Sequence, residues 1–143
     1  MIEIQNTVMI GTNKDRVFNY LQDLENFPKW NYAVSKVIKL HRTNEFGNEL
    51  YGIYRESSGP SYEEGWIKNL KSGEKIEFTI NGGWFPYEME YKLSEQGNIT
   101  ELTNYARIYP NLIKKMPLLL AKAQLRGAVQ QNLIVLKGIL EKM

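Results

Sequence analysis

Apolar and polar residues alternate along much of the first two-thirds of the chain. In the opening segment Ile2, Ile4, Val8 and Ile10 share one face, and Asn6 is a polar interruption on that face. This period of two predicts a half-buried strand. Similar strand-like runs follow at residues 34–42, 47–56, 61–70, 74–81, 85–95 and 99–109.

Short turn signals separate these runs. They are rich in glycine, serine, proline and asparagine, at Gly47, Ser58-Gly59-Pro60, Ser72-Gly73, Asn81-Gly82-Gly83 and Gln96-Gly97-Asn98. Turns of hairpin length join antiparallel neighbours, whereas a parallel crossover needs about a dozen or more connecting residues. The sequence therefore predicts seven antiparallel strands, of which the last six form a meander.

A change of period predicts helices at two places. Apolar residues recur at helical spacing from Val17 to Leu24, ahead of Pro28 and a short bend that ends at Trp30. From about residue 111 to the end, leucine and valine recur at helical spacing with Lys and Gln between them. This pattern predicts one long amphipathic helix, with Pro117 in its first turn or at a kink.

These elements predict an α+β fold in which a curved antiparallel sheet wraps around the long C-terminal helix, with short helices between the first two strands. The apolar face of the sheet and the apolar stripe of the helix cover each other. A strongly curved sheet does not contact a straight helix along its whole length. We therefore expect an internal cavity between the two, of the kind that binds small molecules.

Composition narrows the classes of function. The chain has 143 residues, which predicts a single domain over 1–143, and 43% of them are hydrophobic. The net charge of +2 is dispersed, which argues against nucleic-acid binding. There is no cysteine, no signal peptide and no transmembrane stretch, so we expect a cytoplasmic protein, as a monomer or a homodimer.

The residue inventory also limits the chemistry of a site. His41 is the only histidine, so clusters of histidine ligands are excluded, and its place beside Arg42 at a strand end favours an exposed side chain. Neither a glycine-rich phosphate loop nor a dinucleotide fingerprint occurs. We expect no metal and no cofactor.

Three segments carry a family resemblance. The opening strand with Asp15–Asp23, the Phe27–Trp30 segment and the closing helix from Gln131 to Glu141 together resemble the START-like superfamily, also called SRPBCC or helix-grip. The resemblance covers about residues 2–142 and is greatest to the polyketide cyclase/dehydrase branch. It implies the helix-grip fold with an internal cavity. Members include lipid and sterol carriers, hormone receptors, aromatic cyclases and co-chaperone domains, so the fold does not define the function.

Candidate ligand-binding residues follow from the strand faces and the helix stripe. Along residues 85–95, alternation directs Phe85, Tyr87 and Met89 inward and Glu88 and Glu90 to water. For the inward residues, ordinary core packing explains the pattern as well as pocket lining does, and Trp84 could cap one end of the sheet. The candidates are Trp30, Tyr54, Trp66, Phe78, Trp84, Tyr87, Met89, Tyr91, Asn104, Leu118, Leu125 and Val129.

Glu64 and Arg55 are the candidate catalytic residues. Glu64 shares strand parity with Trp66, so it enters the cavity if Trp66 does, where it could act as an acid or base. The alternative is that Glu63, Gly65 and Ile67 form the inner face and Glu64 is solvated. An inward Arg55 could pair with Glu64 or receive a ligand carboxylate.

Three functions fit these observations. The leading hypothesis is the binding of a small hydrophobic or aromatic molecule in the cavity. The second is a cyclase or dehydratase acting on a polyketide-like substrate, which requires a buried carboxylate with a perturbed pKa beside the cavity and loses its best candidate if Glu64 is solvated. The third is a protein-interaction domain, which requires an exposed apolar patch outside the pocket.

Overall fold

The computed structural model describes residues 1–55, 61–81 and 83–143. The turn predicted at Ser58-Gly59-Pro60 and the middle position of the turn predicted at Asn81-Gly82-Gly83 lie outside these residues. Within the described part of the chain, no helix combines the length and the apolar character needed to cross a bilayer.

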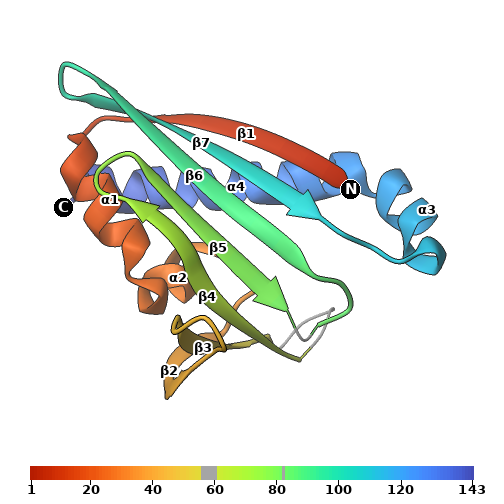
Figure 1. Cartoon of the computed structure of the whole chain (residues 1–143). Coiled ribbons are helices and arrows are strands. Elements are labelled where there is room, and N and C mark those ends of the chain that lie inside the picture. Colours follow the sequence, from red (N-terminus) through yellow and green to blue (C-terminus); the bar gives the residue numbers. More distant parts are fainter. Residues whose placement is uncertain (56–60, 82) are drawn as a thin grey trace.

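One antiparallel sheet forms the body of the protein, in the order β1-β7-β6-β5-β4-β3-β2. This arrangement confirms the predicted seven-stranded sheet, and Figure 1 shows its curvature. Apart from β1, which pairs with the last strand, each strand lies beside its neighbour in the sequence because short turns favour hairpins. The strands are β1 Ile2–Ile10, β2 Lys36–Thr43, β3 Glu49–Tyr54, β4 Tyr62–Lys71, β5 Lys75–Asn81, β6 Tyr87–Gln96 and β7 Ile99–Ile108.

Short helices connect β1 to β2, as predicted. Helix α1 (Lys14–Gln22) begins at Asn13, whose side-chain oxygen accepts a hydrogen bond of 2.9 Å from the Arg16 N–H. A 3₁₀ turn, η1 (Leu24–Asn26), and helix α2 (Phe27–Trp30) follow. The segment expected to be a bend is therefore one helical turn, and it buries both of its aromatic side chains.

The predicted long C-terminal helix is present, but its expected start near residue 111 was wrong, because a separate short helix precedes it. Helix α3 (Leu112–Leu120) ends at Ala121, and α4 (Lys122–Glu141) begins directly after it. The Ala121 N–H donates to the carbonyl oxygen of Pro117, at a distance of 3.0 Å. The helical conformation ends at Ala121, where φ is −88° and ψ is 0°, and Pro117 removes one backbone hydrogen bond within α3 itself. Figure 1 shows α4 running across the sheet and α3 projecting beyond it near the N-terminus.

The main core lies between the sheet and the second half of α4. Leu133, Leu136 and Leu140 of this helix are completely buried there. A smaller apolar cluster, built around Ile4 and Ala106 on β1 and β7, lies toward the first half of α4. Full burial therefore occurs along only part of the helix, as expected for a curved sheet against a straight helix.

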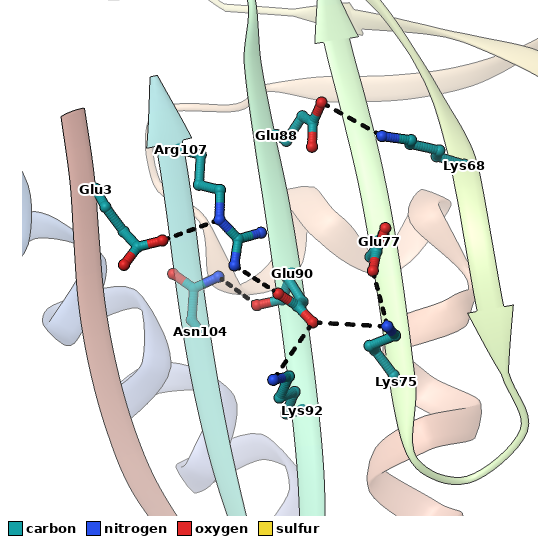
Figure 2. A network of polar contacts seen from close by, with 9 residues as sticks. All are labelled: Glu3, Lys68, Lys75, Glu77, Glu88, Glu90, Lys92, Asn104 and Arg107. Carbon is teal, nitrogen blue, oxygen red and sulfur yellow. Dashed lines mark hydrogen bonds and ion pairs between the residues drawn. The ribbon is translucent and has the colours of Figure 1, made fainter. Parts of the chain in front are cut away.

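Ion pairs cover the outer face of the sheet (Figure 2). Arg107 on β7 contacts Glu3 at 2.9 Å and Glu90 at 2.8 Å, so it bridges β1 and β6. Lys75 and Lys92 lie within 3.9 Å of the same Glu90 carboxylate. Glu90 is on the outer face, as predicted, but it is only 5% exposed, so the expectation that it faces water was wrong. Long basic neighbours screen it from solvent.

Candidate functional site

A cavity of about 330 Å³ lies beneath the first half of α4. Helix residues spaced three or four apart form one wall, because that spacing keeps them on one side of a helix. The sheet forms the opposite wall, and aromatic residues of the connecting loops border the opening. The lining includes Ile4, Tyr87, Met89, Ala106 and Ile108 from the sheet, Leu125, Ala128, Val129 and Asn132 from α4, and Phe27, Tyr32, Trp84 and Phe85 from the connections.

The cavity is where the sheet and helix lack large side chains to fill the gap. Ala106 on β7 and Ala128 on α4 both line it, and neither reaches across. Further along α4, Leu133 and Leu136 close the same gap completely. The predicted internal cavity is therefore present at one end of the sheet-helix interface.

Arg55, Glu63 and Tyr87 form the polar end of this cavity, and we call them the polar triangle. Arg55, directly after β3, donates from Nε to Glu63 at 2.8 Å and from Nη2 to the Tyr87 hydroxyl at 2.7 Å. The Tyr87 hydroxyl donates a longer hydrogen bond of 3.4 Å to the same Glu63 oxygen. The register between β3 and β4 explains why these side chains meet. Glu63 pairs with Ile53, and Arg55 follows Ile53 by two residues, on the same side of the chain. Successive side chains alternate in direction, so both point inward.

The triangle is a buried ion pair with a neutral phenol. The side chains of Arg55 and Glu63 are 15% and 3% exposed. Burial lowers the pKa of Arg55, but the neighbouring Tyr87 and Glu63 raise it more strongly, so its guanidinium stays protonated. Burial raises the pKa of Tyr87 well above its ordinary value, against the opposing effect of Arg55. The phenol therefore remains a hydrogen-bond donor.

Glu64 lies on the outer face, where it contacts Arg42 at 2.7 Å and accepts a hydrogen bond of 2.9 Å from Tyr62. The structure therefore has the second of the two predicted arrangements of β4, in which Glu63 and Gly65 form the inner face. The suggested pairing of Arg55 with Glu64 was wrong, because Glu63 is the carboxylate at the cavity.

Asn132 is a polar cavity residue that sequence reasoning missed. It is 8% exposed and lines the cavity from α4, next to Val129. Its signal was present in the sequence, since Asn132 follows Leu125 and Val129 by seven and three residues on the same apolar stripe. A polar residue within such a stripe marks either a buried hydrogen bond or a binding site.

Five of the twelve candidate ligand-binding residues line the cavity. Met89 and Tyr87 contribute from β6, and the remaining three come from α4 and the loop before β6. They are Trp84, Tyr87, Met89, Leu125 and Val129. Trp84 is 56% exposed, which places it at the opening.

Three aromatic candidates pack in the main core instead. Tyr91 meets Trp30 and Phe78 edge to face, with ring centroids 6.1 Å and 5.6 Å away. All three side chains are almost fully buried. These three residues are therefore part of the packed core and do not line the cavity beneath α4.

Tyr54 and Trp66 lie on the outer side of the sheet. Ile53 and Arg55 point inward, so alternation directs Tyr54 outward, and its ring lies 5.0 Å from that of Tyr62. Trp66 shares its face with Tyr62 in the same way. On α3, Leu118 packs against the smaller apolar cluster.

Asn104 belongs to a row of polar groups on the inner face. It pairs in register with Asn6 on β1 and with Tyr91 on β6. Asn6 Oδ1, Asn104 Oδ1 and the Tyr91 hydroxyl are buried without a hydrogen-bond partner in the described structure. The row lies one step along the strands from Ile4 and Ala106, which line the cavity.

Comparisons with known proteins agree with this architecture. The model of the family "Polyketide cyclase / dehydrase and lipid transport" matches residues 1–141. No curated protein matches the chain.

Solved structures of similar fold have low sequence identity. A START superfamily protein from Mycobacterium smegmatis is 18% identical, with a TM-score of 0.80, and 98% of this chain and 97% of that one are covered. The protein TTHA0849 from Thermus thermophilus is 16% identical, with a TM-score of 0.74, and 97% of each chain is covered.

The Zhui aromatase/cyclase from Streptomyces sp. R1128 is 14% identical, with a TM-score of 0.72, and 99% of this chain and 92% of that one are covered. At these identities the solved structures establish the fold, and the family model establishes the membership. The chain has the fold of the START superfamily structure and belongs to the polyketide cyclase/dehydrase and lipid transport family.

Proposed function

We propose that this protein binds a small, mostly apolar molecule that carries a neutral carbonyl or hydroxyl group. The observation that carries the proposal is an apolar cavity of about 330 Å³ with the polar triangle at one end. That volume falls at the lower end of the range of roughly 300–1,000 Å³ found for small-molecule pockets. It suits a compact ligand, such as a molecule with two or three fused rings.

The charge of the triangle favours a neutral polar group over a carboxylate. The positive charge of Arg55 is balanced by Glu63 at 2.8 Å, so an anionic ligand would approach an existing carboxylate. A guanidinium has five N–H donors, and two of those of Arg55 are used within the triangle. The others can donate to a ligand oxygen, and the Asn132 amide offers a further donor and acceptor on the helix side.

A set of matched naphthalenes tests this proposal. Acetylnaphthalene, naphthoic acid and ethylnaphthalene share a ring system and differ in the polar group. Thermal shift and native mass spectrometry should show a one-to-one complex and the largest stabilisation with the ketone. A wider panel of quinones, flavonoids, sterols and fatty acids extends the search. The absence of any complex across both sets would refute ligand binding, and preferential binding of the acid would refute the neutral-group assignment.

The triangle also favours a second candidate function, a cyclase or dehydratase. This function requires a buried carboxylate beside the cavity, and Glu63 provides one next to the Tyr87 phenol. Because burial raises the pKa of Tyr87, its phenol stays protonated and is a weak acid, so it would serve by hydrogen bonding to a substrate oxygen. Tyr87→Phe should then abolish turnover of a polyketide-like substrate while its binding persists. Unchanged turnover in this variant would exclude a role for the Tyr87 hydroxyl in the reaction.

A further inference from the structure

Helix α3 exposes a continuous apolar stripe that the cavity does not use. Its five members are between 42% and 90% exposed, and none of the residues of α3 is buried. We call them the α3 stripe: Leu112, Ile113, Met116, Leu119 and Leu120. Neighbouring turns of the helix contribute residues three or four positions apart, so all five lie on one side of the helix. Exposed apolar surface of this kind marks a membrane or protein interaction site.

The stripe faces away from the protein body. Leu118 is the α3 side chain that packs inward, against the cluster that includes Leu125. At 100° per residue, Leu118 lies nearly opposite Met116, which is near the centre of the stripe. The helix is therefore attached by one side, and its other side is free to contact a flat apolar surface.

The charges around the stripe favour an anionic partner. Lys115 flanks the stripe, and Lys122 and Arg126 follow at the start of α4. Between Glu101 and Glu141 the sequence contains no acidic residue at all. A short apolar face with basic neighbours is typical of helices that lie in the interface of an anionic bilayer.

The same surface continues to the opening of the cavity. Lys114 Nζ donates a hydrogen bond to the carbonyl oxygen of Trp84, a residue that lines the cavity and is 56% exposed. Tyr109, just before α3, is 39% exposed. Tryptophan and tyrosine favour the interface between lipid and water. We infer that α3 docks this protein on an anionic lipid surface, with the stripe inserted among the lipids and Trp84 at the interface.

Vesicle cosedimentation of the full chain tests docking. One vesicle type contains phosphatidylcholine alone, and the other contains equal parts of phosphatidylcholine and phosphatidylglycerol. The wild-type chain should bind the anionic vesicles more tightly, and binding should weaken as salt is added. Neither vesicle contains a candidate cavity ligand, so docking and cavity binding can fail independently.

Two variants and one control identify the surface. Ile113 and Leu120 are 86% and 81% exposed, so Ile113→Ser combined with Leu120→Ser should leave the fold intact. This variant should lower vesicle affinity by about tenfold or more, because two large apolar side chains no longer enter the lipid. Lys115→Glu with Lys122→Glu should remove the preference for anionic vesicles. Phe46→Ser replaces a residue of similar exposure, 77%, outside the α3 stripe, and this variant should bind like the wild type.

The possible results separate clearly. Vesicle binding that persists in the serine variant would overturn the assignment to α3. A wild-type chain that ignores both vesicle types would overturn docking itself. If that chain forms a dimer that the serine variant dissociates, the stripe contacts a second copy. If the wild-type chain binds neither vesicle type and stays monomeric, the remaining occupant of the stripe is a different protein.

Discussion

Arg55 donates a hydrogen bond of 2.7 Å to the hydroxyl of Tyr87, which comes from a different strand of the same sheet. The bond fixes the orientation of the phenol at the cavity wall. Arg55 also lines the cavity, so its guanidinium lies at the wall that a bound molecule would contact. The hydrogen bond therefore holds two parts of the sheet together and also fixes the polar groups at the cavity wall.

Removing Arg55 alone should destabilise the protein severely. Glu63 would remain as a buried carboxylate without its partner, which costs about 3–5 kcal/mol. Arg55→Met should therefore lower the free energy of unfolding by that amount in urea denaturation. Arg55→Met with Glu63→Leu should recover most of the loss, because both charges are then absent. Losses that simply add in the double variant would contradict a coupled pair.

Gly65 should not tolerate a methyl group. A Cβ there would lie 3.1 Å from the backbone oxygen of Thr79 and 3.2 Å from Ile53 Cδ1. Gly65→Ala should lower the free energy of unfolding by about 1–3 kcal/mol. The control is Gly127→Ala on α4, where a Cβ meets nothing within 4 Å. It should stabilise the protein by about 0.4–1 kcal/mol. Equal effects at the two glycines would show that Gly65 is not tightly enclosed.

Asn104 should be replaceable by an apolar residue with a gain in stability. Its Oδ1 lacks a partner within the described structure, and its Nδ2 makes only a long contact of 3.5 Å to the Glu90 carbonyl oxygen. Asn104→Leu should raise the free energy of unfolding by about 1 kcal/mol. Thr100→Val, which removes a buried hydroxyl bonded at 2.7 Å to the Thr12 carbonyl oxygen, should lower it by a similar amount. Destabilisation by Asn104→Leu would indicate that this amide is hydrogen-bonded in solution.

Glu141 should stabilise the folded protein at neutral pH and lose this contribution in acid. Its carboxylate accepts hydrogen bonds from Lys137 and from the Gly11 N–H, and these lower its pKa below the ordinary value of 4.5. A lowered pKa in the folded state contributes stability that is complete above the ordinary value and is lost as the pH falls below it. Glu141→Gln should therefore show a smaller fall in melting temperature between about pH 6 and pH 3 than the wild type. Parallel curves would contradict this contribution.

The strand faces could be predicted where alternation was clean. Tyr87 and Met89 on β6 point inward as expected, because the charged Glu88 lies between them in the sequence. In β4, the segment around Glu63 and Glu64 has no such pattern. Its inner face is decided by pairing, since Gly65 lies opposite the buried Ile80 of β5. That long-range register is not encoded locally.

The break in the C-terminal region also depended on more than local pattern. Leucines continue at helical spacing through Pro117, which suggested one helix. The break instead lies at Ala121, four residues after the proline, and attachment of Leu118 to the smaller cluster turns the α3 stripe outward. The cavity itself was predictable from the curvature of the sheet. At its polar end Arg55 and Tyr87 were among the candidates, but Glu63 was not, because the parity of β4 depends on pairing with β5.

Filling the cavity tests the binding proposal most directly. Val129 on α4 lines the cavity, and Ile134 on the same helix is 47% exposed. The affinity of the tightest ligand from the panels should be measured by titration calorimetry for the wild type, Val129→Phe and Ile134→Phe. We expect Val129→Phe to weaken binding by at least about a hundredfold through steric overlap, and Ile134→Phe to match the wild type. Unchanged affinity in a folded Val129→Phe variant would place the ligand outside this cavity and contradict the account.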